Sequence, residues 1–318
     1  MVLRTEEDRE PFLFDALLSL AAQTCSDFEV LVMAHDVSTS TMRSIEENVA
    51  EFDQDFTRRI KCTNVHGGGR ARPFNVGMAM AIGDYVSCAD DDMVAFAHCV
   101  EAYRAAATSA PHRVVRARVA SQQIEPMPWG QRAGYVATGG VCTPFPEVFD
   151  FWAYLFDDRS PKCGFALPRR YLEGLETPFD ESLQLGEEKE TVARAVMQNG
   201  IVEASEVTVL TRCWHISDPI RIAGDMQQWE RTRSTLVARL NDTALPFPPG
   251  TVGAMDAYHR ELIRARAEMA AVESERTAVQ DALHHLQSEY ESVMRSESWR
   301  LTKPLRLVSN RLRRSRKR

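Results

Sequence analysis

Three consecutive aspartates, Asp90, Asp91 and Asp92, are the residues whose types and spacing most clearly indicate chemistry. Like charges repel at this spacing, so the cluster needs a cation or hydrogen-bond donors to offset it. Mg²⁺ and Mn²⁺ take oxygen ligands, typically one or two carboxylates together with substrate phosphates. Because the cluster ends a short apolar strand within Gly83–Val94, we expect a nucleotide-diphosphate site there. A solvated acidic turn is the alternative.

A second pair of carboxylates, Glu187 and Glu188, stands at the start of a predicted helix. From Glu187 onward the apolar residues recur at helical spacing, and Asn199-Gly200 forms a stop signal. A lone Glu-Glu pair on such a helix is ordinarily a solvated face. The pair becomes a candidate for acid–base chemistry only through its context.

A third group closes the alternating apolar stretch 207–218, which predicts a strand ending in Arg212, Trp214 and His215. A histidine beside a tryptophan is more often a packed core residue than a ligand. The local sequence does not decide between these readings.

The elements that must position these groups alternate between strands and helices, as in an α/β fold. A strand is expected over 2–5, a helix over 11–24 and a second strand over 28–36 that ends at His35-Asp36. A glycine loop, Gly67–Gly69, then precedes a small-residue helix from Pro73 to Ile82. The loop lacks both the Gly-x-Gly-x-x-Gly and the Gly-Lys-Ser/Thr patterns, so it is a weak phosphate signal. Ligands of parallel sheets bind beyond the carboxyl ends of the strands.

In this order and spacing, the pieces RT, LLSLAAQT, DFEVLVMAHD, GGGRARPFNVGMAMAIGDYV and ADDDM resemble a family 2 glycosyltransferase of the GT-A fold. The resemblance covers about residues 2–220 and is most specific from Gly67 to Met93. It implies an α/β fold with a Rossmann-like mixed sheet flanked by helices. Only Met1, Val2 and Leu3 precede Arg4-Thr5, whereas the family usually has more apolar residues there. A late annotated start and a frayed sheet edge are the two explanations.

Carried over residue by residue, the resemblance makes Asp92 a ligand of the Mn²⁺ or Mg²⁺ that bridges the donor diphosphate, with His215 as a third metal or phosphate contact. Asp36 would contact the nucleotide base near Arg70, and Asp90 the ribose or a metal-bound water. Arg212 would pair with the pyrophosphate. The expected nucleotide-sugar contacts are Thr5, Asp36, Arg70, Asn75, Asp90, Asp91 and Arg212.

The resemblance also supplies a general base. The family has a Glu-Asp pair followed by an arginine, and Glu187-Glu188 and Arg194 occupy those places. Glu188 is the expected base and Glu187 the second choice, although glutamate is longer than the usual aspartate. A helix N-terminus favours the ionised carboxylate, so we expect the base to be deprotonated at neutral pH.

Sugar and acceptor recognition should lie between the two carboxylate groups. Candidates for stacking on a sugar are Trp129, Trp152, Tyr154 and Phe165, of which at most one or two are expected to act, because most large aromatic residues are core. The segment from Cys163 to Arg170 falls where the family has its acceptor-side strand.

Composition agrees with a cytoplasmic enzyme. The 318 residues, 44% hydrophobic and 26% charged, suffice for one catalytic domain and an appendage. No run of about 18 apolar residues and no signal-peptide pattern is present. The seven cysteines are scattered without Cys-x-x-Cys pairs, which argues against a zinc site or a disulfide framework.

The sequence divides at a proline- and glycine-rich linker. We expect a catalytic domain over 1–244, the linker over 245–255 and a coiled-coil helix over 256–297. The alternative for the helix is one that lies back on the catalytic domain. Spacings of four and three residues alternate without a break along Tyr258, Leu262, Ala265, Met269, Val272, Arg276, Val279, Leu283, Leu286, Tyr290 and Val293. This seam predicts a homo-oligomer.

The tail, 298–318, is basic. From Arg300 onward it has nine Lys/Arg and no Asp/Glu, so a net charge of −7 leaves about −16 for the preceding residues. Leucines interleave with the charges, which favours an anionic membrane surface over nucleic acid and places the protein peripherally on the inner face of the membrane. The segment Ser296–Arg306 also resembles one in bacterial surface-polysaccharide glycosyltransferases, which implies a lipid-linked glycan acceptor.

Two other functions compete with an inverting, metal-dependent glycosyltransferase. A nucleotidyltransferase shares the sheet and the aspartate site, but it normally has a glycine-rich loop after the first strand, where this chain reads RTEEDRE. A catalytically inactive scaffold that organises polysaccharide assembly is the other.

Overall fold

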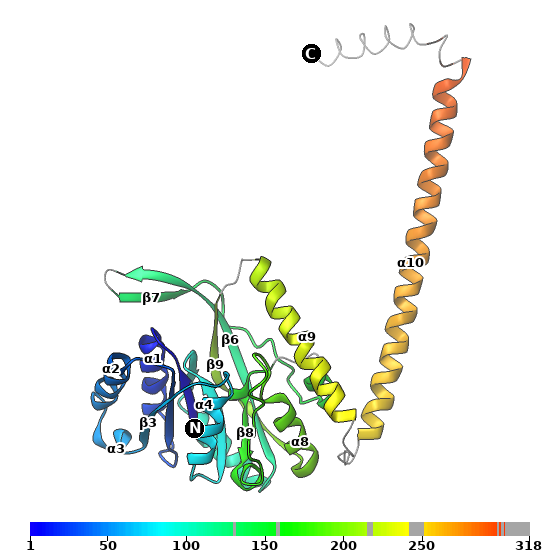
Figure 1. Ribbon diagram of the computed structural model, residues 1–318. Coiled ribbons are helices and arrows are strands. Elements are labelled where there is room, and N and C mark those ends of the chain that lie inside the picture. Colours follow the sequence, from blue (N-terminus) through cyan, green and yellow to red (C-terminus); the bar gives the residue numbers. More distant parts are fainter. Residues whose placement is uncertain are drawn as a thin grey trace. The chain divides into compact units, whose positions relative to one another are not determined.

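The computed structural model describes residues 1–129, 132–156, 160–214, 219–241, 251–297, 299 and 302. The chain forms two compact units, Met1–Pro248 and Pro249–Arg318, which are described separately (Figure 1). The positions of Gly130, His215 and most of the tail beyond Glu297 lie outside the described residues.

The first unit begins with four parallel strands whose apolar runs are buried between helices. The strands are β1 (Val2–Thr5), β2 (Val30–His35), β3 (Ile60–Val65) and β4 (Tyr85–Asp90). The helices among them are α1 (Glu10–Ala21), α2 (Thr39–Ala50), α3 (Gln54–Thr57) and α4 (Arg72–Met80). The α/β reading of the sequence is thereby confirmed.

Strand β1 lies inside the sheet, not at its edge. All four of its residues are buried, and it pairs with β2 on one side and β4 on the other. The expected frayed edge is therefore wrong. Both neighbouring strands supply backbone hydrogen bonds to β1.

The second half of the unit adds antiparallel pairing and two long strands. Its strands are β5 (Met93–Ala95), β6 (Val114–Trp129), β7 (Arg132–Ala137), β8 (Phe165–Pro168) and β9 (Ile201–Trp214). Strand β9 begins six residues before the predicted stretch 207–218, because it follows β6 along nearly its whole length.

The described strands form one curled mixed sheet in the order β3-β2-β1-β4-β8-β6-β9-β5, with β7 on β6. Strands β4 and β5 are joined only by Asp91 and Asp92, yet β8, β6 and β9 lie between them in the sheet. A two-residue connection can span this separation only if the sheet bends back on itself. The curl therefore places the aspartates where the edge strand β5 comes back to β4, inside the sheet.

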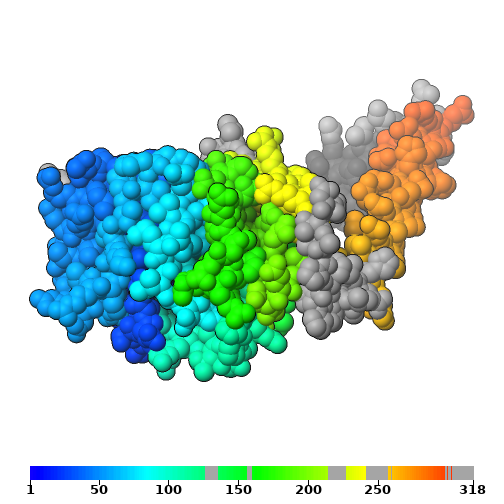
Figure 2. Space-filling view, turned by 60° about the horizontal axis from the view of Figure 1, so that its bottom comes forward, coloured from blue at the N-terminus to red at the C-terminus, as the bar shows by residue number. Residues whose placement is uncertain are grey.

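Figure 2 shows the surface of the first unit, from blue in its first half to green and yellow in its second half. The remaining helices of the unit belong to the second half and follow β5 in the chain (Figure 1). They are α5 (Cys99–Ser109), α6 (Phe151–Phe156), the single 3₁₀ turn η1 (Lys162–Gly164), α7 (Arg169–Leu172), α8 (Lys189–Asn199) and α9 (Pro219–Asn241). Helix α8 ends as predicted, at Gly200 with φ of +72°, the left-handed conformation that glycine adopts at no steric cost.

The second unit is dominated by helix α10 (Thr251–Arg295). The helix starts at Thr251 and not at residue 256, so part of the predicted linker is helical. Every described side chain from 257 to 297 is exposed. In the described part of the chain, no helix has the length and apolar character needed to cross a membrane.

Candidate functional site

Asp90, the last residue of β4, is surrounded by three cations. Its Oδ1 accepts a hydrogen bond from Arg4 Nη1 at 3.0 Å, and its Oδ2 accepts from Arg70 Nη2 at 2.6 Å and Lys162 Nζ at 3.1 Å. Burial alone would raise the pKa of Asp90, but the charges of Lys162, Arg70 and Arg4 outweigh it and hold this pKa well below its ordinary value. Asp90 is thus ionised and fixed.

Asp91 faces the chain interior. Only 1% of it is exposed, and its carboxylate accepts hydrogen bonds from Thr5 Oγ1 at 2.6 Å and Arg9 Nε at 2.7 Å. Thr5 and Asp91, both expected to contact the nucleotide sugar, therefore contact each other. This corrects the expectation for both: they join β1 to the aspartate turn and hold the outer aspartates in place.

Asp92 is the aspartate whose negative charge is least compensated. Its side chain is 29% exposed, and the nearest recorded cation is Arg9 Nη2 at 3.8 Å. Partial desolvation raises its pKa to about 7, and Asp90 and Asp91 add to this rise. A carboxylate that repels its neighbours in this way fits a site for a divalent cation.

The described residues contain no group of three metal-binding side chains. Asp92 would thus supply one oxygen ligand, with donor phosphates completing the shell, as is usual for Mg²⁺. His215, the other expected ligand, lies outside the described residues.

Glu187 and Glu188 precede α8 and are nearly fully buried, at 1% and 5% exposed. Glu187 Oε1 lies 3.1 Å from Lys162 Nζ and 3.5 Å from Arg70 Nε. Lys162 and Arg70 are the same two cations that bind Asp90. The structure thus brings the aspartate cluster and the glutamate pair, about a hundred residues apart in sequence, into one site.

The charge state expected for Glu188 needs correction. Burial raises its pKa, and Glu187 raises it further, against the opposing charge of Lys162. Its side chain makes no capping hydrogen bond to α8. Because desolvation outweighs the helix N-terminus, Glu188 binds a proton more readily than an ordinary glutamate.

The turn that carries the glutamates is packed beneath α9. Gly186 has φ of +68°, and a Cβ there would lie 2.9 Å from Trp229 Cζ3. Thr232 Oγ1 donates to the carbonyl of Leu185 at 2.7 Å. No local pattern predicts this contact, since neither Trp229 nor Thr232 belongs to a recognisable motif.

Asp36 and the glycine loop meet at the carboxyl end of β2. Asp36 has φ of +52°, and its Oδ1 accepts from the Gly67 N–H at 2.8 Å. This hydrogen bond lowers the pKa of Asp36, whose side chain is 54% exposed. Asp36 is therefore ionised and accessible, as a contact to a nucleotide base requires.

Asn75 is a clamp between α4 and the segment before the glutamates. Its side chain donates to the carbonyl of Phe179 at 2.9 Å and accepts from the Phe179 N–H at 2.8 Å. It also donates to Glu181 Oε1 at 3.1 Å, and it is 8% exposed. These bonds use its amide groups inside the chain, which corrects its assignment to the donor.

Arg212 also differs from expectation. Its guanidinium is 4% exposed, lies 3.0 Å from Asp15 Oδ2 and bonds to the Tyr135 hydroxyl. It ties β9 and β7 to α1, while its own N–H donates to the carbonyl of Asp92 at 3.1 Å. In this arrangement Arg212 supports the aspartate turn, and its guanidinium is committed to Asp15 instead of a pyrophosphate. Arg194, the arginine after the glutamates, pairs with Glu190 at 2.8 Å.

Two of the four candidate sugar-stacking aromatics belong to the core. Tyr154 and Phe165 are 0% and 2% exposed, with ring centroids 5.2 Å apart. Neither has surface for a sugar, so this expectation is wrong for both. Trp152 is partly buried beside Phe151, and the side chain of Trp129 lies outside the described residues.

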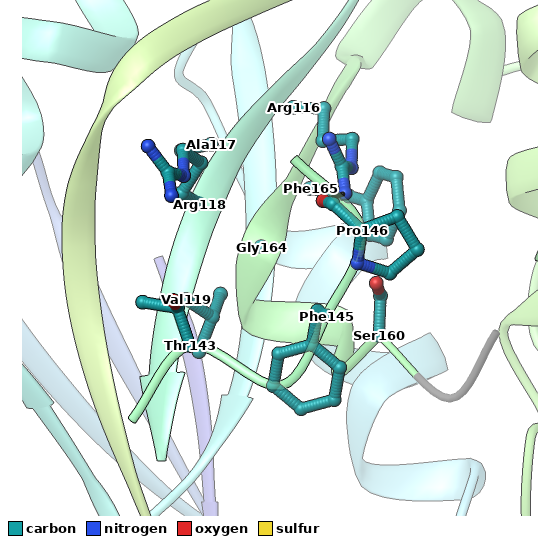
Figure 3. A pocket seen from close by; sticks show the side chains of 10 residues that line it. All are labelled: Arg116, Ala117, Arg118, Val119, Thr143, Phe145, Pro146, Ser160, Gly164 and Phe165. Carbon is teal, nitrogen blue, oxygen red and sulfur yellow. Dashed lines mark hydrogen bonds between the residues drawn. The ribbon is translucent and has the colours of Figure 1, made fainter. Parts of the chain in front are cut away.

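A small hollow lies beside β6 and the segment that leads to Lys162 (Figure 3). Arg116 and Arg118 border it, and both guanidinium groups are paired, with Glu203 at 2.8 Å and Glu147 at 3.1 Å. Among the predicted site residues and candidate aromatics whose side chains are described, only Phe165 lines this hollow. It is thus distinct from the cluster that holds the aspartates and glutamates.

The sequence reading missed three cations of the site: Arg4, Arg9 and Lys162. Arg4 stood in the recognised Arg-Thr pair without an assigned role, and Lys162 directly precedes the segment Cys163–Arg170. A single basic residue carries no periodicity or spacing by which it could be found. Only the curled sheet brings these side chains to the carboxylates.

Comparison with solved structures gives a fold likeness. Residues 1–349 of S. aureus TarS, in a crystal structure with UDP-GlcNAc, match with a TM-score of 0.52 and 19% identity over 74% of this chain and 65% of that one. A structure of the same segment with UDP has a TM-score of 0.49 and 18% identity, covering 73% of this chain and 64% of that one. A longer TarS structure matches over 36% of its length, with 19% identity and a TM-score of 0.49.

The chain thus spans about a third to two thirds of the solved chains it matches. No curated protein matches it. At this identity the TarS likeness concerns the fold alone. The sequence profile of glycosyl transferase family 2 matches residues 5–165, about half of the chain, and this segment contains the glycine loop and all three aspartates of the site. The chain belongs to glycosyl transferase family 2.

Proposed function

We propose that this protein is an inverting, metal-dependent glycosyltransferase that moves a sugar from a nucleotide-diphosphate donor to a glycan acceptor. One observation carries the proposal: Arg70 and Lys162 each contact both Asp90 and Glu187. These shared cations join a donor-type aspartate cluster and a candidate base in one site. Inverting transfer requires both within reach of one sugar.

In this mechanism each residue has a role that follows from its environment. Asp92 and the donor phosphates would hold Mn²⁺ or Mg²⁺, which stabilises the negative charge of the departing diphosphate. Asp36 and Arg70, both reaching solvent, would orient the nucleotide. Glu188 would accept the proton of the acceptor hydroxyl as its oxygen attacks the anomeric carbon, with Glu187 as second choice.

The fold likeness, the basic tail and the heptad seam indicate which donor, acceptor and partners should be tested first. TarS was solved with UDP and UDP-GlcNAc, so uridine donors come first. The basic tail supports a lipid-linked acceptor and a peripheral place on the inner face of the membrane. The exposed heptad seam of α10 supports a homo-oligomer.

The competing enzyme class finds less support. Between β1 and α1 the chain reads Glu6, Glu7, Asp8 and Arg9, a connection without glycine and with three acidic residues. Such a connection repels the triphosphate that a nucleotidyltransferase binds after its first strand. An inactive scaffold would keep the fold and lack turnover, so the same assay separates it.

The test is release of nucleoside diphosphate from a panel of nucleotide sugars in the presence of Mn²⁺. Wild-type protein should hydrolyse at least one donor, and excess chelator should abolish this. Asp92→Asn should abolish it as well and weaken Mn²⁺-dependent UDP binding in calorimetry. Its thermal stability should be unchanged or higher, because the substitution removes repulsion from Asp90 and Asp91.

Asp90→Asn is the matched control for the predicted effect on stability. It leaves Arg4, Arg70 and Lys162 without their shared carboxylate, so unfolding should become easier by about 3 kcal/mol. Turnover that persists in Asp92→Asn or with chelator would refute the metal assignment. Absence of turnover with every donor, despite a folded protein, would favour the scaffold.

A further inference from the structure

The Lys162 ammonium lies between two carboxylates from different motifs, the buried Glu187 and the partly buried Asp90. Its Nζ is 3.1 Å from Asp90 Oδ2 and 3.1 Å from Glu187 Oε1, and the side chain is 11% exposed. Asp90 ends the donor-side strand, whereas Glu187 precedes α8. One cation therefore sets the separation between the donor side and the base side of the site.

The backbone around Lys162 holds this ammonium in place. Lys162 begins the 3₁₀ turn η1, in which the Gly164 N–H donates to the carbonyl of Pro161 at 2.9 Å. The carbonyl of Cys163 accepts from the Tyr103 hydroxyl at 2.8 Å. A Cβ on Gly164 would lie 3.0 Å from Val119 Cγ2, so the turn is pressed against β6.

The side chain is restrained as well. Its Nζ lies 4.8 Å from the centroid of the Phe74 ring on α4, a cation–π distance. Contacts with a ring, two carboxylates and a fixed backbone restrict a side chain that otherwise has many rotamers. Its ordering cost is therefore met on folding and not at each turnover.

Arg70 also contacts both Asp90 and Glu187, but it is more exposed than Lys162 and can turn toward a bound donor. Its side chain is 33% exposed, and its Nε is 3.5 Å from Glu187, a longer contact than that of Lys162. When Arg70 engages a donor, as proposed above, Lys162 remains as the buried counter-charge of Glu187. The two cations thus have separate roles.

We propose that Lys162 is a positioning residue. It fixes the carboxylate pair Glu187-Glu188 at a set distance from the donor-side Asp90, so that the pair can accept the proton of the acceptor hydroxyl. This inference rests on the proposed function. Lys162 acts through Glu187 and is not itself required to touch the donor.

The electrostatic surroundings of Glu188 support this role. Burial and Glu187 raise its pKa, while Lys162 and Lys189 lower it. The Cys88 thiol, which interacts electrostatically with Glu188, is held neutral by burial, which raises its pKa to about 12. Loss of the Lys162 charge would therefore raise the pKa of Glu188 further.

The test compares Lys162→Met with Lys162→Arg in donor hydrolysis. The methionine variant should lose about 100-fold in kcat, with KM for the donor changed less than threefold. The pH at which kcat reaches half of its maximum should be about 1 unit higher in this variant than in the wild type. Lys162→Arg should keep the wild-type midpoint even at a lower rate.

A matched control removes a cation that lies outside the site. Arg58 is 75% exposed beside Asp55, and Arg58→Met should leave rate and pH profile unchanged. Binding of UDP with Mn²⁺ should be within threefold of wild type in Lys162→Met. A tenfold loss of UDP binding, or a wild-type pH midpoint in the methionine variant, would overturn the positioning role.

A double-mutant cycle does not require turnover. If Lys162 acts on Glu187, Lys162→Met should lower the melting temperature much less in a Glu187→Gln background, because no buried charge is then left unpaired. Additive effects would overturn the inference. Because the cycle uses unfolding alone, it still tests Lys162 if the wild type turns over no nucleotide sugar, a result that would refute only the proposed function.

Discussion

At the scale of residues, Glu188 combines burial with a like-charged neighbour. Replacing it with Gln removes the proton acceptor at nearly constant volume, so turnover should fall by roughly 10² or more while UDP binding stays similar. Because the pKa of Glu188 is raised, the rate of the wild type should climb with pH above the range of an ordinary glutamate. Steady-state kinetics from pH 5 to 9 would measure both effects.

Glu187→Gln is the natural comparison. Glu187 faces two cations, so its loss should lower stability, and turnover should decline less than in Glu188→Gln. If Glu187→Gln instead abolishes turnover while Glu188→Gln retains it, the roles of the two carboxylates are exchanged. If both variants retain turnover, the proposed inverting mechanism loses its base.

The sequence located the carboxylates of the site but not their partners. Asp90, Asp92, Glu187 and Glu188 stood in runs with recognisable context, and the fold brings their two clusters together. Arg212 shows the limit, since its partner Asp15 is 197 residues away in the chain. A pairing of this kind depends on how the sheet curls, which no local pattern encodes.

At the scale of elements, α4 shows how small residues bring a helix close to the sheet. A Cβ on Gly77 would lie 2.3 Å from Val2 Cγ1 and 3.1 Å from Met33 Cγ. Gly77→Ala should therefore reduce the free energy of unfolding by about 1–3 kcal/mol, through overpacking of a full core. Urea denaturation would measure this change.

Gly174→Ala is the control for this prediction. There the nearest atom to a new Cβ is the carbonyl oxygen of Tyr171 at 3.7 Å, an ordinary contact, and φ is not in the left-handed region. Its stability should match or slightly exceed that of wild type, because alanine restricts the unfolded chain. Equal stability losses in the two variants would contradict the packing argument.

Prediction at this scale was accurate where one strand or helix has its own apolar period, as in β2, α1 and the end of α8. It was incomplete for β6 and β9, whose length comes from pairing with each other. The order of the strands in the sheet could not be predicted from the sequence either, because it also depends on long-range pairing. The separation of β4 from β5 by three strands follows from long-range pairing and has no signal at Asp91-Asp92.

At the scale of the whole molecule, α10 exposes its apolar seam along its length. Large side chains such as Val279 and Leu286 are 68% and 62% exposed. An isolated helix gains most of its stability from packing, so this seam needs a partner. Its heptad spacing suits a second copy of the same helix.

The charges beside the seam favour a parallel pairing of copies. If Leu262, Met269, Arg276, Leu283 and Tyr290 are the first residues of the heptads, four of the five residues that precede them are glutamates: Glu261, Glu268, Glu275 and Glu289. An antiparallel pair would place these glutamates opposite one another. In a parallel pair, Glu275 lies instead beside Arg276 of the other copy, which offsets the one polar residue of the seam.

We therefore expect the full-length chain to sediment as an oligomer and the chain ending at Pro248 to sediment as a monomer that still hydrolyses the donor. Replacing Leu262 and Leu283 with Asp should dissociate the oligomer, because both residues face the seam. Salt-sensitive binding to anionic vesicles should weaken in the same variant, although every basic residue of the tail remains, since several weak contacts on one particle add through effective concentration.

Strand direction can be measured separately by cysteine cross-linking. Leu286→Cys places a thiol in the seam near one end of α10, where only parallel, in-register copies bring two such thiols together. Ser288→Cys, on the outer face of the same turn, and the wild-type chain with its free thiols are the controls. Cross-linking by Leu286→Cys alone supports the parallel seam. Oligomerisation without this cross-link indicates antiparallel or shifted helices. An oligomer that survives truncation at Pro248 would show that the catalytic unit itself assembles. The seam of α10 would then bind a partner other than a second copy.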